Sequence, residues 1–304
     1  MKPVAEVTNH PLASRAAKHD GALTILALTV ALLPWSSAFA GIRAALYAYA
    51  PAHVALSRFL LASLLLAIYA VLTRKRLPAW RDLPVILPAG LLGITFYHLG
   101  LNYGEQTVTA GAASLLVAST PVFAALLARA FLGDRLRVLG WMGIAVSFAG
   151  VALIALGESG QVKFSKGAVW ILLAALSAAA SLIFQKQYLR KYQPGDFACH
   201  MIWAGTLFLL PFFPGLVSTV RSAPLHTTLA LVYLGVFPTA IAQIAWGWLL
   251  LRHAVPNAAA YLYIIPVLAI FIAWIWLGEV PSLLSFVGGT VTLVGVVMVN
   301  RRPR

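Results

Sequence analysis

The chain has 304 residues, of which 61% are hydrophobic and only 10% are charged. A soluble domain carries about 25% charged residues, so this composition excludes a soluble globular protein and indicates an integral membrane protein. The formal net charge of +14 would suggest a nucleic-acid partner in a soluble chain, but basic residues of a membrane protein report its orientation, so no nucleic-acid partner is expected.

Residues 1–21 form a polar stretch that lacks the short apolar core and small-residue cleavage site of a signal peptide, so we expect a cytoplasmic tail. Ten apolar spans follow, each close to the roughly 20 residues that cross a bilayer as a helix: 22–42, 53–73, 83–103, 109–132, 137–156, 167–188, 196–217, 227–250, 256–278 and 282–300. Membrane β-strands are half as long and alternate in polarity. The sequence therefore predicts an all-α membrane protein with ten transmembrane helices and a second tail at residues 301–304.

Basic residues are distributed unevenly between the two sides of this predicted bundle. Fifteen lie in segments on the side of the N terminus, and four lie on the other side, namely Arg43, Lys163, Lys166 and Arg221. Cytoplasmic loops carry the excess of Lys and Arg in membrane proteins. We therefore expect a multi-pass protein of the cell (inner) membrane with both termini in the cytoplasm.

A repeat relates the two halves of the chain. A shift of 145 positions lays Ala110–Ile154 on Val255–Val299 without a gap. The aligned pairs are Pro121 with Pro266, Gly133 with Gly278, Asp134 with Glu279, Gly143 with Gly288 and Gly150 with Gly295. The alternative is a chance likeness of two helical hairpins, but shared apolar composition would not align these residue types together. We expect a duplication, with one repeat at residues 22–156 and the other at 157–300.

Each expected repeat holds five spans, and this number fixes the relation between them. Because five crossings deliver the chain to the opposite side, the second repeat is inverted relative to the first. Inverted repeats are typical of secondary transporters, whose substrate site lies near the bilayer midplane between the repeats. The sequence thus predicts two five-helix inverted repeats around a central cavity. The paired glycines are expected to allow close helix contact.

Several short motifs carry a resemblance to a known family. They are Trp35-Ser36-Ser37-x-Phe39 with Arg43, Pro51, Arg58-Phe59, Pro121-Val122-Phe123, Phe131-Leu132-Gly133-Asp134-Arg135, Pro266 and Leu277-Gly278-Glu279. Taken together they resemble the EamA-type ten-helix family of the drug/metabolite transporter superfamily over residues 22–301. The resemblance implies a basket of ten helices, alternating access, and similarity to amino-acid exporters, including aromatic ones.

Polar side chains within the spans are the candidates for lining the cavity, because a polar group facing lipid is costly. In span three they are Tyr97, His98 and Asn102; in span eight, Gln243 and Trp246; in span nine, Asn257 and Tyr261; and in span one, Trp35 and Ser37. Three other roles stay open for these residues: a hydrogen-bonded cap at the outer end of span three, interhelical hydrogen bonds, and a tyrosine at the membrane interface.

Prolines and basic residues within spans have predicted roles of their own. Pro34, Pro121 and Pro266 lie inside apolar spans, where a missing hydrogen bond makes either a gating hinge or a fixed kink. Arg58, Arg129 and Lys186 lie near span ends, and long basic side chains there are expected to reach the lipid headgroups.

Two absences narrow the function. No phosphate-binding GxxxxGK[ST] loop is present, so an ATP-driven pump is excluded. The single cysteine and sparse histidines indicate no disulfide framework, no metal and no cofactor. We expect facilitated export of small metabolites, amino acids above all, by a monomer with alternating access. The alternative is a proton-coupled drug or metabolite permease that uses His98 or Glu105, and a membrane enzyme is a remote alternative.

Overall fold

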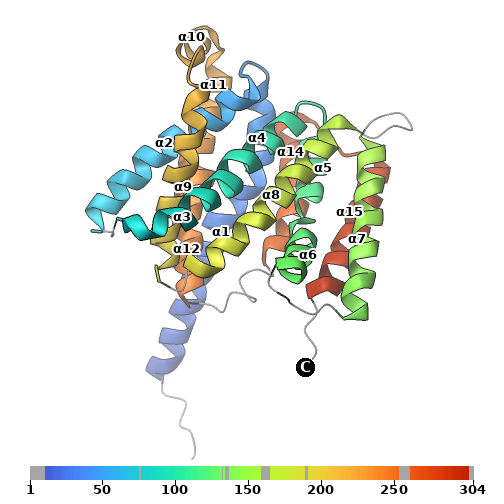
Figure 1. Ribbon diagram of the computed structural model, residues 1–304, viewed down its shortest axis with the longest axis horizontal. Coiled ribbons are helices and arrows are strands. Elements are labelled where there is room, and N and C mark those ends of the chain that lie inside the picture. Colours follow the sequence, from blue (N-terminus) through green and yellow to red (C-terminus); the bar gives the residue numbers. More distant parts are fainter. Residues whose placement is uncertain are drawn as a thin grey trace, which may run out of the picture.

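The computed structural model describes residues 11–74, 77–131, 133, 137–158, 165–188, 191–252 and 261–300. These residues form helices and connecting turns, with no strand among them, which confirms the all-α prediction (Figure 1). The first half holds α1 (Pro11–Leu46), α2 (Pro51–Leu72), η1 (Trp80–Asp82), α3 (Leu83–Gly90), η2 (Leu91–Phe96), α4 (Tyr97–Gly104), α5 (Ala110–Val117), α6 (Thr120–Phe131) and α7 (Val138–Gly157). The second half holds α8 (Lys166–Tyr188), α9 (Pro194–Leu209), η3 (Leu210–Phe212), α10 (Leu216–Ser222), α11 (Leu225–Leu234), η4 (Gly235–Ile241), α12 (Ala242–Arg252), η5 (Leu262–Ile264), α14 (Ile265–Leu277) and α15 (Leu283–Asn300).

Eight helical stretches in the described residues are long and apolar enough to cross a membrane. They are Gly21–Leu46, Pro51–Leu72, Trp80–Gly104, Ala110–Phe131, Val138–Gly157, Lys166–Gln185, Gly195–Phe212 and Leu225–Arg252. Two shorter apolar helices, Leu262–Leu277 and Leu283–Val299, follow them. Each stretch overlaps one of the ten predicted spans, and the chain is a multi-pass membrane protein by length and composition.

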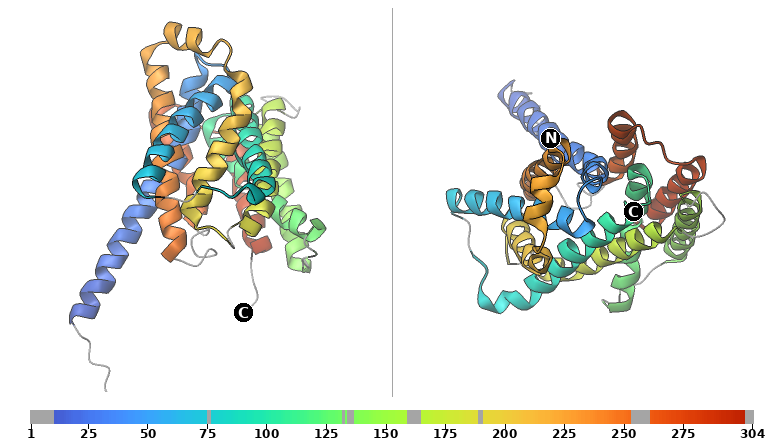
Figure 2. Two further views of the ribbon diagram at one scale, coloured as in Figure 1. Left: turned by 60° about the vertical axis from the view of Figure 1, so that its left-hand side comes forward. Right: turned by 90° about the horizontal axis from the view of Figure 1, so that it is seen from above.

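The helices run between two ends of one bundle. The first turns of α1 and the last turns of α15 lie at the bottom of Figure 1, whereas α10 lies at the top. Seen from above, α2 lies at one edge and α7 lies beside α15 at the opposite edge (Figure 2). The elements between these edges, among them α1, α4, η4 and α14, surround the site described below.

Helices α7 and α15 make a reciprocal contact through four glycines. A Cβ atom on Gly143 would lie 2.7 Å from the carbonyl oxygen of Gly295, and one on Gly150 would lie 2.5 Å from that of Gly288. Gly143 aligns with Gly288 and Gly150 aligns with Gly295, each pair being 145 positions apart. The contacts are therefore crossed: Gly143 meets Gly295, and Gly150 meets Gly288. Only glycine permits this backbone approach, and the predicted close helix contact is confirmed.

The two prolines of the aligned segments lie at helix starts, and the prediction of mid-helix prolines was wrong. Helix α5 ends at Val117 and α6 begins at Thr120, so Pro121 is in the first turn of α6. Pro266 is in the first turn of α14, directly after the 3-10 turn η5. First-turn amides have no intrahelical acceptor, so a proline removes no hydrogen bond there. Pro34, in contrast, lies inside the continuous helix α1.

Two π-helical segments interrupt the third and eighth apolar stretches. They are η2 and η4, and they lie about 145 positions apart in the chain. A π-turn widens the helix by one residue and is frequently found at functional sites. Within η4, the Thr239 hydroxyl donates to the carbonyl oxygen of Leu234 at 2.7 Å, so the side chain itself bonds to the widened turn. Sequence pattern did not predict either segment.

Candidate functional site

A cavity of about 320 Å³ lies between the elements from the two halves of the chain. Its wall is largely apolar and comes from α1, α2, η2, α4, α5, α9, η4, α12, η5 and α14. The larger apolar side chains include Phe39, Ile42, Phe59, Leu101, Met201 and Ile265. The polar ones are Trp35, Arg58, Tyr97, His98, Thr239 and Gln243. Its volume and this mixture are typical of a small-molecule site.

Equivalent positions of the two halves line this cavity together. Four pairs of lining residues are 145 positions apart: Gly93 with Pro238, Ile94 with Thr239, His98 with Gln243, and Val117 with Leu262. The first two pairs belong to the π-helical segments, and the last pair lies at the matched helix breaks. The irregular backbone of both halves therefore faces one space, as in transporters whose broken helices meet at a central site.

Tyr97 and His98, two of the residues predicted from the third span, lie in the cavity wall. The His98 ring packs edge-on between Phe59 and Tyr97, with ring centroids 4.5 and 4.6 Å away. Its Nδ1 lies 2.8 Å from the carbonyl oxygen of Ile94. A carbonyl oxygen only accepts, so Nδ1 carries the proton in this bond and Nε2 is the acceptor nitrogen of the neutral ring.

Trp35 and Gln243 line one side of the cavity, whereas Trp246 packs against Trp35 and does not line it. The indole Nε1 of Trp35 donates to the carbonyl oxygen of Pro238 at 2.9 Å, which joins α1 to η4. The ring of Trp35 lies 5.3 Å from that of Trp246. Trp246 and Gln243 line a second hollow of about 90 Å³ beside the start of α9 and the end of α12. Gln243 also lines the larger cavity, so it joins the two.

Other predicted residues do not reach the cavity wall. Asn102 is fully buried and donates from Nδ2 to the carbonyl oxygen of Pro51 at 2.9 Å. Ser37 bonds to the hydroxyl of Tyr233 and to the carbonyl oxygen of Pro34. Tyr261 is 40% exposed, and neither it nor Ser37 nor Asn102 lines the cavity. Asn257 lies outside the described residues.

Arg58 lies in the cavity wall, and the prediction that it reaches the headgroups was wrong. Its residue surface is only 4% exposed. Nε and Nη2 donate to the Thr239 hydroxyl at 3.1 and 3.0 Å, and Cζ lies 5.3 Å from the centre of the Phe59 ring. The available signal was a cation within an apolar span, which marks a functional position inside a membrane.

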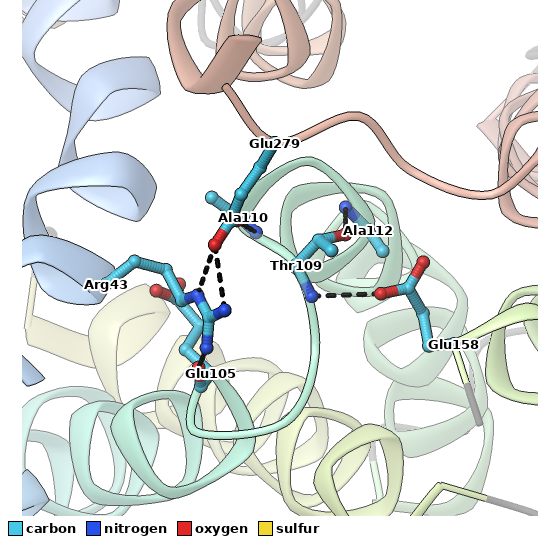
Figure 3. Close-up of polar contacts among 7 residues, drawn as sticks. All are labelled: Arg43, Glu105, Thr109, Ala110, Ala112, Glu158 and Glu279. Carbon is cyan, nitrogen blue, oxygen red and sulfur yellow. Dashed lines mark hydrogen bonds and ion pairs between the residues drawn. The ribbon is translucent and has the colours of Figure 1, made fainter. Parts of the chain in front are cut away.

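A polar cluster lies where the end of α1 meets the turns after α4 and after α14 (Figure 3), at the end of the bundle opposite the chain termini (Figure 1). Arg43, near the end of α1, donates from Nε to Glu279 Oε1 at 2.9 Å and pairs through Nη2 at 2.8 Å. Its Nη1 donates to the carbonyl oxygen of Glu105. Glu279 Oε2 accepts from the Ala110 amide at 3.1 Å. One guanidinium thus ties α1, the turn after α4 and the turn after α14 together.

Glu158, at the end of α7, bonds to the turn after α4 from its other side. Glu158 Oε2 accepts from the Thr109 amide at 2.9 Å, and Glu158 Oε1 accepts from the Ser285 hydroxyl at 2.8 Å. Inside the cluster the Glu105 side chain is fully buried, and neither of its carboxylate oxygens has a hydrogen-bond partner. The cluster therefore contains the buried carboxyl group of Glu105 close to Arg43, whose guanidinium pairs with the carboxylate of Glu279 instead.

The match to known families decides the class of this protein. The model of the EamA-like transporter family matches residues 22–156 and again residues 165–301. The chain belongs to the EamA-like transporter family. It is thus a membrane transporter, and the names of its relatives point to transport rather than to an enzyme.

Individual relatives of this EamA-like chain cover most of its length. It is 44% identical over 262 residues to the "Uncharacterized transporter YdfC" of Bacillus subtilis, covering 86% of each chain. It is 42% identical over 279 residues to a "Probable terminal-alkyne amino-acid exporter" of Streptantibioticus cattleyicolor, covering 91% of this chain and 93% of the other. One crystal structure superposes with a TM-score of 0.60 over 90% of this chain and 95% of that chain, at 20% identity, which supports the fold alone.

Proposed function

We propose that this EamA-like transporter exports small metabolites, amino acids first among them, by alternating access. The observation that carries this proposal is the cavity built from equivalent positions of both halves, with an apolar wall and a few polar groups. Such a wall suits a small amphiphilic solute. The relative named as a probable terminal-alkyne amino-acid exporter, at 42% identity, supports amino acids as the substrate class.

The proposal includes ten membrane crossings arranged as two inverted repeats, residues 22–156 and 157–300. The reciprocal glycine contact of α7 with α15, the matched helix breaks and the matched π-helical segments support it. The excess of basic residues on the side of the termini supports an inner-membrane protein whose residues 1–21 and 301–304 lie in the cytoplasm. Because one chain supplies both repeats, a monomer suffices for transport.

We assign this arrangement to a state that is closed on the outside. The Arg43–Glu279 pair joins α1 to the turn after α14 at the end opposite the termini. The second hollow, in contrast, extends from Gln243 toward the start of α9 and the end of α12, at the end where the chain termini lie. Substrate would therefore enter from the cytoplasm and leave after the outer cluster separates.

Counterflow in liposomes tests the proposed function. Purified protein is reconstituted into vesicles loaded in turn with each of the twenty unlabelled amino acids, or with an aromatic amine or another metabolite, and uptake of the same labelled compound is followed. Saturable, transient accumulation of at least one amino acid, absent from protein-free vesicles, is the expected result. If none of the twenty amino acids exchanges while aromatic amines or other metabolites do, the export of amino acids is wrong and a permease of another class is correct.

A second candidate is proton-coupled transport, which the buried and unpartnered carboxyl group of Glu105 favours. A carboxyl group inside a transport protein is a common carrier of the exchanged proton. Imposing a pH gradient of one unit across the vesicles distinguishes the candidates. Facilitated export predicts the same final distribution of substrate with or without the gradient, whereas proton coupling predicts accumulation against the substrate gradient that Glu105→Gln abolishes.

A further inference from the structure

Arg58 is a buried cation in the wall of the cavity, and its hydrogen-bond partner is neutral. Two of its N–H groups converge on the Thr239 hydroxyl. Within the described part of the chain, the ion pairs are Arg43 with Glu279 and Lys191 with Asp82, and neither includes Arg58. A guanidinium has five N–H donors, so most of its donor capacity is unused by these residues.

A charge in this position is costly without a counter-charge. Moving an ion from water into a protein interior costs several kcal/mol, and a partner of opposite charge with good hydrogen-bond geometry is needed to offset it. Inside membranes, ionisable residues are rare and mark substrate pathways by default. No carboxylate of the described residues pairs with Arg58, and its side chain borders a hollow of about 320 Å³ that a solute can fill.

We propose that Arg58 binds the carboxylate of the transported solute, an inference that rests on the proposed export function and narrows its substrate class to carboxylic acids. Arginine suits this task because its planar fork pairs with both oxygens of a carboxylate. The apolar wall of Phe39, Ile42 and Phe59 receives the remainder of the solute.

The cavity also offers an acceptor for the ammonium group of an amino acid. His98 Nδ1 donates to the Ile94 carbonyl oxygen, so in its neutral form the ring of this lining residue has Nε2 as an acceptor. The Gln243 side chain, at the equivalent position of the other half, supplies an amide oxygen. The cavity thus offers a cation on α2 and two neutral acceptors on α4 and α12, which complement the two charges of a zwitterion. An amine without a carboxylate would bind less well, because no described carboxylate lines the cavity to pair with its ammonium group.

Thr239 is the positioning residue for Arg58. Its hydroxyl donates to Leu234 and accepts from Arg58, so the single hydroxyl proton is directed away from the guanidinium and its lone pairs face it. The π-helical segment η4 places this hydroxyl beside α2. The alternative is that the Arg58–Thr239 contact only stabilises the packing of α2 against η4. Solute binding and this packing role predict different effects of small carboxylates on the protein.

Thermal unfolding of the purified full-length protein with small probes makes this distinction. The probes are L-phenylalanine, 3-phenylpropionate, which keeps the carboxylate alone, and phenethylamine, which keeps the amine alone. We expect the two carboxylates to raise the unfolding midpoint of the native protein and phenethylamine to have no effect. Arg58→Gln should weaken carboxylate binding at least about tenfold, the effect of losing one charge-assisted hydrogen bond. The matched control Arg129→Gln changes an exposed cation of α6 and should bind as the native protein does.

Two further variants keep the test decisive if Arg58→Gln does not fold. Arg58→Lys retains a cation and should keep the preference for carboxylates with lower affinity, and Thr239→Val should weaken binding less than loss of the charge does. Carboxylate binding that is unchanged in all three variants overturns the proposal, as does equal stabilisation of the native protein by phenethylamine or no stabilisation by any carboxylate. If Arg58-dependent binding of 3-phenylpropionate is found while no amino acid exchanges in liposomes, the carboxylate site stands and the amino-acid function fails.

Discussion

Arg43 and Glu279 form an ion pair between the end of α1 and the turn after α14, with 2.8 Å between Nη2 and Oε1. The pair joins segments 236 positions apart, one from each half of the chain. Both side chains are partly buried, and the guanidinium also bonds to the carbonyl oxygen of Glu105. The contact is therefore a candidate latch for the outer end of the transport path.

Breaking this latch is expected to expose the cavity to the outside. In a Cys199→Ser background, Leu101→Cys places a thiol at a buried position of the cavity wall. Adding Arg43→Gln removes the ion pair and should raise the reaction rate of that thiol with an impermeant reagent applied from outside by about tenfold, the equivalent of about 1.4 kcal/mol in the opening equilibrium.

The control for the latch is a second ion pair at the opposite end. Lys191 pairs with Asp82 at 2.7 Å, and its side chain is more than half exposed, so Lys191→Gln should leave the labelling rate unchanged. Equal labelling of Leu101→Cys with and without Arg43→Gln would show that the ion pair does not hold the outer end closed.

The glycines between α7 and α15 are expected to tolerate no side chain. In Gly150→Ala the added Cβ atom would lie 2.5 Å from the Gly288 carbonyl oxygen and from the Thr292 amide nitrogen, so the helices must separate. Overpacking of this kind costs about 1–3 kcal/mol, measurable as a lower unfolding midpoint in detergent. Gly21→Ala, whose Cβ atom meets nothing within 4 Å, should keep the native midpoint; equal midpoints for both variants would contradict the tight contact.

His98 and Asn102 offer a comparison between a lining residue and a packing residue one helical turn apart. His98→Ala should slow amino-acid exchange by tenfold or more while the unfolding midpoint changes little, because the ring borders the cavity. Asn102→Ala leaves the buried Pro51 carbonyl without its donor and should cost about 1–3 kcal/mol of stability. Parallel loss of folded protein in both variants would assign His98 to packing.

Pro266→Ala tests whether the first turn of α14 acts as a hinge. The proline removes no regular helical hydrogen bond at this position, so the unfolding free energy should change by less than about 1 kcal/mol. Exchange at the native rate would place the hinge at the 3-10 turn η5 before α14, whereas slow exchange at an unchanged midpoint would assign it to Pro266. Initial exchange rate and midpoint are measured on one preparation.

The parts of this fold that sequence predicted best are those that depend on repetition. The shift of 145 positions aligned Gly143 with Gly288 and Gly150 with Gly295. In space, Gly143 meets Gly295 and Gly150 meets Gly288. The prolines were placed wrongly because apolar composition continues through a helix break, so Val117 and Thr120 look like one helix. The π-helical segments could not be predicted either, because the apolar sequence continues through them as well.

The candidate site was predicted in part, and the errors have one physical source. His98, Asn102 and Glu105 share a helical face, as their spacing indicates, but this face crosses from the cavity to a packed interface and then to the outer cluster. Arg58 was assigned to the headgroups by its place in the sequence. Its true surroundings depend on Thr239, which is 181 positions away, and no local pattern predicts that contact.

The glycine contact between α7 and α15 also supplies a fixed reference for measuring motion. Neither helix contributes a residue to the cavity wall, and backbones this close leave no room for one helix to slide past the other. Spin labels on these two helices should therefore keep a constant separation throughout the transport cycle. A third label near Arg43 at the end of α1 would then report absolute displacement against that rigid pair, so that opening of the outer end can be followed in a single membrane-embedded molecule.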